Sequence, residues 1–109
     1  MSSPSNTVVT LPEKVRRGEV FEIRALVRHE METGFRHTEQ GVRVLRDIIR
    51  EFTCTYNGEE VFRAMLHPGI SANPLFTFYC RAVKSGDLEF RWMGDNDYQT
   101  VSKHSIVVL

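Results

Sequence analysis

Apolar and polar residues alternate along much of the chain, which is the pattern of β-strands with one buried face. From Val20 onwards every second side chain is apolar: Phe21, Ile23, Ala25 and Val27. Leu26 is an apolar residue on the outward side of this strand. A strand from Leu75 to Val83 likewise places four residues on one face: Phe76, Phe78, Cys80 and Ala82. These two segments predict half-buried strands.

Turn residues divide the chain between such strands. Asn57-Gly58 lies between the apolar segments 52–56 and 61–66, and this dipeptide is typical of a tight hairpin with positive φ. Ser85-Gly86 precedes a strand through Leu88, Phe90 and Trp92. The turn at residues 94–97 leads to a last strand that ends the chain. Frequent turns between short strands favour an all-β protein.

The stretch from Glu39 to Phe52 fits two structures. Four of its apolar residues also have helical spacing: Val42, Leu45, Ile49 and Phe52. We predict a loop around Gly41 and a strand from about Ile48, because two consecutive β-branched residues and the following hairpin favour extension.

About seven strands of this kind predict an immunoglobulin-like antiparallel β-sandwich. Cys54 and Cys80 lie too close in sequence for the usual antibody bridge, so the sandwich would be a variant. At 109 residues the chain has room for one domain, which we place at 7–109 after a flexible N-terminus, 1–6.

Composition narrows the classes of partner. Fourteen basic and fourteen acidic residues cancel, which disfavours nucleic acid and anionic membranes. The first residues lack the pattern of a secretory signal, and no window of the sequence is apolar enough to insert in a membrane. Taken alone, composition predicts a soluble cytoplasmic protein with protein or small-molecule partners.

Candidate chemistry is sparse. The four histidines (His29, His37, His67 and His104) lie far apart, so we expect no metal site. Glu30 and Glu32 are neighbouring carboxylates on a loop, which predicts no perturbed pKa and no acid–base pair. No nucleophile, base and orienting group occur in series, so we expect no catalytic residues and no cofactor.

Cys54 and Cys80 both have inward parity in aromatic-rich strands. Buried free thiols are the preferred interpretation, because inward cysteines usually behave as small apolar residues. A disulfide between the two and a bond to a partner chain remain alternatives. A small redox protein that uses either cysteine is a competing hypothesis for function.

Several blocks of the sequence together resemble the SoxZ family, the non-catalytic partner subunits of the SoxYZ sulfur-carrier complex in bacterial thiosulfate oxidation. The blocks follow the family's order and spacing over roughly residues 11 to 109. They are His29-x-Met31-Glu32-x-Gly34-x-Arg36, Arg46-x-Ile48-Ile49-x-x-Phe52-x-Cys54, Asn57-Gly58-x-x-Val61-Phe62, Ile70-Ser71-Ala72-Asn73-Pro74-x-Phe76-x-Phe78 and Ser85-Gly86-x-x-x-Phe90-x-Trp92. Leu45 departs from the family, which commonly has a proline there.

The resemblance implies a heterodimer with a SoxY-like subunit, whose C-terminal cysteine in a glycine-rich tail carries the sulfur. The end of this chain has neither the cysteine nor the glycine-rich tail, so we expect this chain to be the supporting subunit and not the sulfur carrier. The resemblance also implies a periplasmic location, reached by co-export with a signal-bearing SoxY. A carrier module of a different oxidation pathway, or another protein-binding sandwich, is the alternative.

Two sets of partner-binding residues follow. Outward apolar positions are candidates for the SoxY interface: Leu26, Ile49, Leu75 and Tyr79. Loop residues are candidates for transient docking of the Sox cytochrome, hydrolase and dehydrogenase components: His29, Met31, Glu32, Arg36, Ser71, Ala72, Asn73 and Pro74. Arg36 is a candidate for steering anionic sulfur species. Pro74 predicts an extended Asn73 and a rigid corner.

Overall fold

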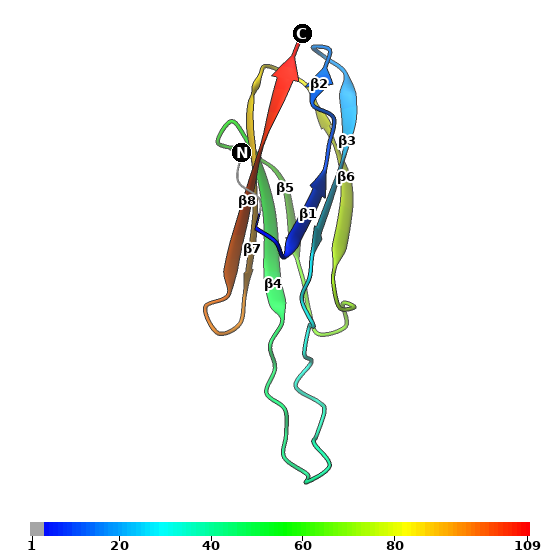
Figure 1. The fold of residues 1–109 in the computed structure, drawn as a ribbon, viewed down its shortest axis with the longest axis vertical. Coiled ribbons are helices and arrows are strands. Elements are labelled where there is room, and N and C mark those ends of the chain that lie inside the picture. The colour runs from blue at the N-terminus through cyan, green and yellow to red at the C-terminus, as the bar shows by residue number, and fades with distance from the viewer. Residues whose placement is uncertain (1–3) are drawn as a thin grey trace.

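The computed structural model describes residues 4–109, which form two facing β-sheets (Figure 1). The three-stranded sheet has the order β1 (Thr7–Thr10), β3 (Val20–Val27), β6 (Leu75–Arg81). The five-stranded sheet has the order β2 (Lys14–Val15), β8 (Gln99–Val108), β7 (Gly86–Gly94), β4 (Ile49–Tyr56), β5 (Glu59–Met65). No helix in residues 4–109 is long and apolar enough to span a membrane.

The predicted all-β sandwich is confirmed. It has eight strands, because the two-residue β2 adds to the expected set. This β2 pairs with β8 in parallel, whereas the other strand pairs are antiparallel. The segment 39–48 contains no helix, and β4 begins at Ile49, close to its predicted start.

The predicted boundary between a flexible N-terminus and the domain stays a prediction. Residues 1–3 lie outside the described residues. Asn6 is tied to the sandwich: its carbonyl accepts a hydrogen bond from the Arg28 N–H at 2.8 Å, and its amide donates to the Tyr98 hydroxyl at 2.9 Å.

A column of aromatic rings holds the two sheets together. Phe52 of β4 is fully buried and stacks on Phe76 of β6, with ring centroids 4.7 Å apart. Phe62 of β5 stacks on Phe78 of β6 at 4.2 Å. Trp92 of β7 lies 5.0 Å from Phe52. Because these rings come from both sheets, they fix the spacing and alignment of the sandwich.

The hairpin at Asn57-Gly58 forms as predicted. Both residues have positive φ, 49° and 84°, which is the geometry of the turn that joins twisted antiparallel strands without splaying them. The Asn57 side chain also accepts a hydrogen bond from the Asp87 N–H at 3.0 Å. The turn is therefore attached to the start of β7 as well as joining β4 to β5.

The prediction that Ile49 faces outward is wrong. Its side chain has no exposed area. Strict alternation from Phe52 would place Ile49 outside, but the pairing of β4 with β7 shifts register between Ile49 and Glu51. Such a bulge adds one residue to a strand and reverses the parity beyond it, so Ile49 and Phe52 both face the core.

The outer faces of the two sheets differ in character. On the five-stranded sheet, ion pairs join neighbouring strands: Arg63 lies 2.6 Å from Glu51, and Lys103 lies 3.5 Å from Glu89. On the three-stranded sheet, Val8, Leu26 and Leu75 are direct cross-strand neighbours. These three residues lie side by side across one end of the sheet, and we call them the apolar row.

Removal of the central ring of the column tests this account of the core. We expect Phe52→Ala to lower the free energy of unfolding by about 3–5 kcal/mol, because it leaves a cavity between the sheets. Urea denaturation followed by tryptophan fluorescence measures the change. Met65→Ala, on an exposed side chain, is the matched control and is expected to alter stability by less than about 0.5 kcal/mol. Equal effects of the two changes would contradict the central place of Phe52.

Candidate protein-binding surface

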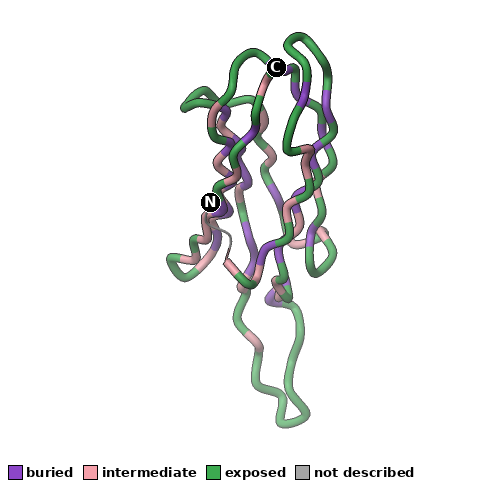
Figure 2. Tube along the Cα trace, turned by 45° about the horizontal axis from the view of Figure 1, so that its top comes forward, coloured by how far each residue is buried: buried purple, intermediate pink, exposed green. Residues whose placement is uncertain are grey.

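Between β3 and β4 the chain leaves the sandwich as a long two-legged arm, residues 28–48. Figure 1 shows the arm at the foot of the molecule, beyond both sheets, and Figure 2 shows it mostly exposed. It contributes to the elongated shape of the protein, which measures 59 × 22 × 19 Å. Backbone bridges join the legs at Glu32 with Asp47 and at His37 with Arg43.

The legs of the arm lie close together. Gly34 has φ +87°, and a Cβ there would come within 2.9 Å of the Cβ of Arg46 on the other leg. Only glycine fits this close approach with this backbone conformation. Nearer the tip, the Val44 N–H donates to the Arg36 carbonyl at 2.8 Å, and the Thr38 N–H donates to the Val42 carbonyl at 2.8 Å. The arm is therefore a paired structure along its length.

Asp95, in the turn between β7 and β8, fixes the root of the arm. Its carboxylate accepts two hydrogen bonds from the Arg46 guanidinium, each 2.9 Å, and one from the Ile48 N–H at 3.1 Å. The Arg50 guanidinium lies 3.2 Å away. The hydrogen bond from Arg46 lowers the pKa of Asp95 below its ordinary value, so the side chain is ionised near neutral pH.

The other leg is fixed by the corner before β6. The His29 N–H donates to the Asn73 side-chain oxygen at 2.9 Å, and the Asn73 N–H donates to the His29 carbonyl at 2.8 Å. The prediction of an extended Asn73 is wrong, because its φ is +52°. Asparagine tolerates this conformation, and the two bonds to His29 hold it there. The corner is thus locked by a distant segment.

Large apolar side chains are exposed on the arm. Phe35 is 77% exposed, Val42 62% and Leu45 78%. The apolar row lies at the base of the arm, since Leu26 is followed by the last residue of β3 and Leu75 is the first of β6. The arm and the row together form one end of the molecule where apolar surface meets solvent, a feature of protein-binding sites.

Three of the predicted partner-binding residues are buried: Met31, Ile49 and Pro74. The Met31 sulfur accepts a hydrogen bond from the Ile49 N–H at 3.3 Å, so both residues belong to the core beneath the arm. These three support the surface and do not reach a partner in this conformation.

The other nine predicted residues are exposed or half-buried: Leu26, His29, Glu32, Arg36, Ser71, Ala72, Asn73, Leu75 and Tyr79. Their roles in binding stay predictions. Most lie near the arm, whereas Tyr79 is farther along β6 and donates to Glu22 at 3.1 Å. Arg36 forms an ion pair with Glu32 at 2.7 Å, which offsets the charge that would steer an anion.

The sequence did not single out four exposed residues of this end as binding candidates: Val8, Phe35, Val42 and Leu45. One feature of the sequence could have pointed to Leu45: it stands where the SoxZ family, which the sequence resembles, commonly has a proline. Val42 and Leu45 also took part in the helical spacing, although no helix forms. Burial depends on tertiary neighbours, so the pattern of residue types alone could not show that these side chains are uncovered.

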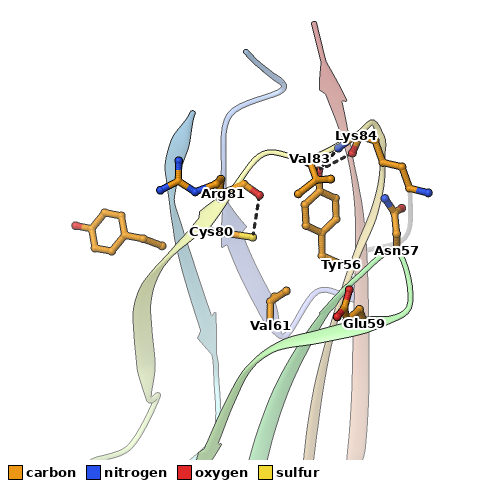
Figure 3. A pocket seen from close by; sticks show the side chains of 9 residues that line it. Tyr56, Asn57, Glu59, Val61, Cys80, Arg81, Val83 and Lys84 are labelled. Carbon is orange, nitrogen blue, oxygen red and sulfur yellow. Dashed lines mark hydrogen bonds between the residues drawn. The ribbon is translucent and has the colours of Figure 1, made fainter. Parts of the chain in front are cut away.

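A second feature lies at the opposite end of the sandwich. An open cavity of about 450 Å³ separates the edge strands β5 and β6 (Figure 3). The Cys80 side chain lines it, together with Val61 and Tyr56, whose hydroxyl accepts hydrogen bonds from the Val83 and Lys84 N–H groups at 3.2 Å. The cavity is thus a gap between two sheet edges.

Both cysteines are free and buried, which confirms the preferred interpretation. Burial raises the pKa of the Cys54 thiol to about 12, and the nearby Cys80 adds to this shift. Burial also raises the pKa of Cys80. The nucleophilic form of cysteine is the thiolate, so neither side chain is activated at neutral pH. Among residues 4–109, no three His, Cys, Asp or Glu side chains converge as a metal site.

The fold and this surface define a small immunoglobulin-like β-sandwich protein with an exposed arm. The sequence model of the family "Sulphur oxidation protein SoxZ" matches residues 9–105, and the chain belongs to the SoxZ family. It is accordingly a component of the Sox system of sulfur oxidation. No curated protein sequence matches the chain.

Solved structures share the fold. The superoxide reductase (neelaredoxin) from Ignicoccus hospitalis has a TM-score of 0.74 and 22% identity over 95% of this chain and 80% of that one. The sulfur carrier protein SoxY from Chlorobium limicola f thiosulfatophilum has a TM-score of 0.68 and 10% identity over 97% of this chain and 81% of that one. At these identities the similarity establishes the sandwich and not its chemistry.

The raised pKa values predict slow reaction of both cysteines with an alkylating reagent. At pH 8 we expect iodoacetamide to label Cys54 of the native chain at least about a hundredfold more slowly than a free thiol, because almost none of it is thiolate. We expect Cys80 to react more slowly than a free thiol as well, because burial raises its pKa. The rate should rise with pH towards the thiol pKa. Mass spectrometry of native and urea-unfolded chain measures the labelling, with the unfolded chain as the control. Fast native labelling of either cysteine would contradict this assignment.

Proposed function

We propose that this chain is the non-catalytic subunit of a SoxYZ-type sulfur-carrier heterodimer. It binds and supports a SoxY-like subunit, and that partner carries the sulfur intermediates of thiosulfate oxidation on its own cysteine. Membership of the SoxZ family supports a SoxY-like partner. The buried, unactivated thiols support a role in binding and disfavour the alternative of a cysteine-based redox protein.

The apolar row carries this proposal. Leu75 is 54% exposed and Val8 44%, and Leu26 lies between them on the same face. Three adjacent apolar side chains that water surrounds are stabilised when a partner covers them. The outer face of the other sheet is crossed by ion pairs and offers no comparable row. The row is therefore the surface of the sandwich best suited to a permanent subunit contact.

Two further roles extend the proposal. The exposed corner residues Ser71, Ala72 and Asn73 are candidates for transient contacts with the Sox enzymes that act on the carrier. The heterodimer also offers a route to the periplasm, in which this chain is exported together with a signal-bearing SoxY-like subunit.

Charged substitutions in the apolar row test the heterodimer. We expect the double variant Leu26→Asp, Leu75→Asp to weaken binding of the purified SoxY-like subunit at least about tenfold, since each carboxylate must lose water to enter the interface. Isothermal titration calorimetry measures the dissociation constant.

Val83→Asp is the matched control for this experiment. Val83 is also exposed, at 61%, but it follows the opposite end of β6 from Leu75. We expect its binding to equal that of the unmodified chain. If the unmodified chain does not bind the SoxY-like subunit, the proposed function is wrong. If both variants bind normally, the row is not the interface.

Export can be tested separately. When the two chains are expressed together, we expect this chain in the periplasmic fraction, and we expect it in the cytoplasm when the partner lacks its signal. Cell fractionation with immunoblotting measures the distribution. A periplasmic location that does not depend on the partner's signal would contradict co-export.

A further inference from the structure

We propose that the arm, residues 28–48, is a rigid prong that inserts its apolar side chains into a groove of the partner subunit whose rim carries carboxylates. This inference rests on the proposed function, because it takes the SoxY-like subunit as the partner. It adds a second contact beyond the apolar row, with a different geometry and a different chemistry.

The arm is stiff. Two backbone bridges join the legs, and further hydrogen bonds pair them up to the turn at the tip. Gly34 lets the legs approach closely, since a Cβ there would come within 2.9 Å of the Cβ of Arg46. At the root, Asp95 holds Arg46 and Ile48, and Asn73 holds His29. An arm fixed in this way loses little conformational freedom when it binds, so more of the contact energy appears as affinity.

The arm presents an apolar surface to solvent. Phe35, Val42 and Leu45 are each more than 60% exposed. Loops of this length are usually polar at their tips, and three large apolar side chains in one loop are stabilised only when another surface covers them. The sandwich of the same chain cannot cover them, because the arm projects away from both sheets (Figure 1). The covering surface must come from another molecule and must be concave to receive a narrow arm.

The outer part of the arm carries a net positive charge. Residues 33–46, the outer part of the arm, contain three arginines and one glutamate, although the chain as a whole is neutral. Arg36 and Arg46 are paired with Glu32 and Asp95 at the root. Arg43 makes no ion pair within the described part of the chain; its Nε donates to the Gly34 carbonyl at 2.8 Å. A cation held in this way beside apolar side chains is complementary to a carboxylate at the rim of an apolar groove.

Asp95 acts in this scheme as a positioning residue. It lies outside the arm and binds the second leg through Arg46 and Ile48. If the arm binds as a rigid element, loss of this contact should weaken binding even though Asp95 itself does not touch the partner. A flexible loop that folds onto the partner would be far less sensitive to such a change.

The main experiment is titration of the SoxY-like subunit into purified variants of this chain. We expect Phe35→Ser with Leu45→Ser to raise the dissociation constant at least about tenfold. Val20→Ser with Val83→Ser removes two exposed apolar side chains at the other end of the sandwich and should bind like the unmodified chain. Circular dichroism and the unfolding midpoint confirm that each variant is folded, which we expect because the arm contributes little to the core.

Two single variants test the chemistry and the stiffness. Arg43→Glu should weaken binding several-fold at low ionic strength and much less at high salt, because the rim contact is electrostatic. Asp95→Asn keeps the size of the side chain but removes its charge, and it should also weaken binding several-fold. The Asp95→Asn change is also combined with Phe35→Ser and Leu45→Ser. If the combined variant binds the SoxY-like subunit no more weakly than the Phe35, Leu45 variant, Asp95 and the arm act in the same contact.

The outcomes separate this inference from the proposed function. If the unmodified chain does not bind the SoxY-like subunit, the proposed function fails. If the unmodified chain binds and the Phe35, Leu45 variant binds equally well, the arm is not an interface and this inference is overturned while the function stands. If the Phe35, Leu45 variant binds the SoxY-like subunit weakly but Arg43→Glu binds it normally at low salt, the proposed carboxylate rim is excluded.

Discussion

The contact between Phe52 and Phe76 is the constraint on which the molecule depends. These rings come from different sheets, so their stacking at 4.7 Å sets how β4 lies over β6. The start of β4 is the end of the arm, and the start of β6 follows the corner that holds His29. The aromatic column therefore places both roots of the arm. A surface that lies outside the core takes its position from rings at the centre of the sandwich.

Residues 33–46, the outer part of the arm, bury no large apolar side chain, and polar contacts at the root help to hold them in place. Asp95 holds the second leg firmly, because its carboxylate accepts two hydrogen bonds from the Arg46 guanidinium and one from the Ile48 N–H. The side chain is only 14% exposed, so the contact is partly shielded from water and salt. Gly94, next to it, has no room for a Cβ, which would lie 2.5 Å from the Ile48 carbonyl. Close backbone packing at Gly94 and the ion pair of Asp95 thus both hold the second leg of the arm at Ile48.

Local patterns predicted the sandwich well but not its binding surface. Alternation of apolar and polar residues was enough to predict β3 and β6, and Asn57-Gly58 was enough to predict the hairpin. These features depend on residues that are close in sequence. Ile49 was misplaced because a bulge reverses parity without a marker in the residue types. The bond between Arg46 and Asp95 joins positions 49 residues apart, and Asn73 took its backbone conformation from His29, 44 residues away. Such contacts depend on the assembled fold.

The ion pairs on the outer face of the five-stranded sheet also make that face poorly suited to a further contact. Arg63 with Glu51, and Lys103 with Glu89, neutralise one another within the sheet, and the edge strand β5 carries further charged side chains. Charges at a sheet edge discourage the addition of another strand. The charged groups on this face must also lose water before another surface can cover it, so a second contact there gains little free energy.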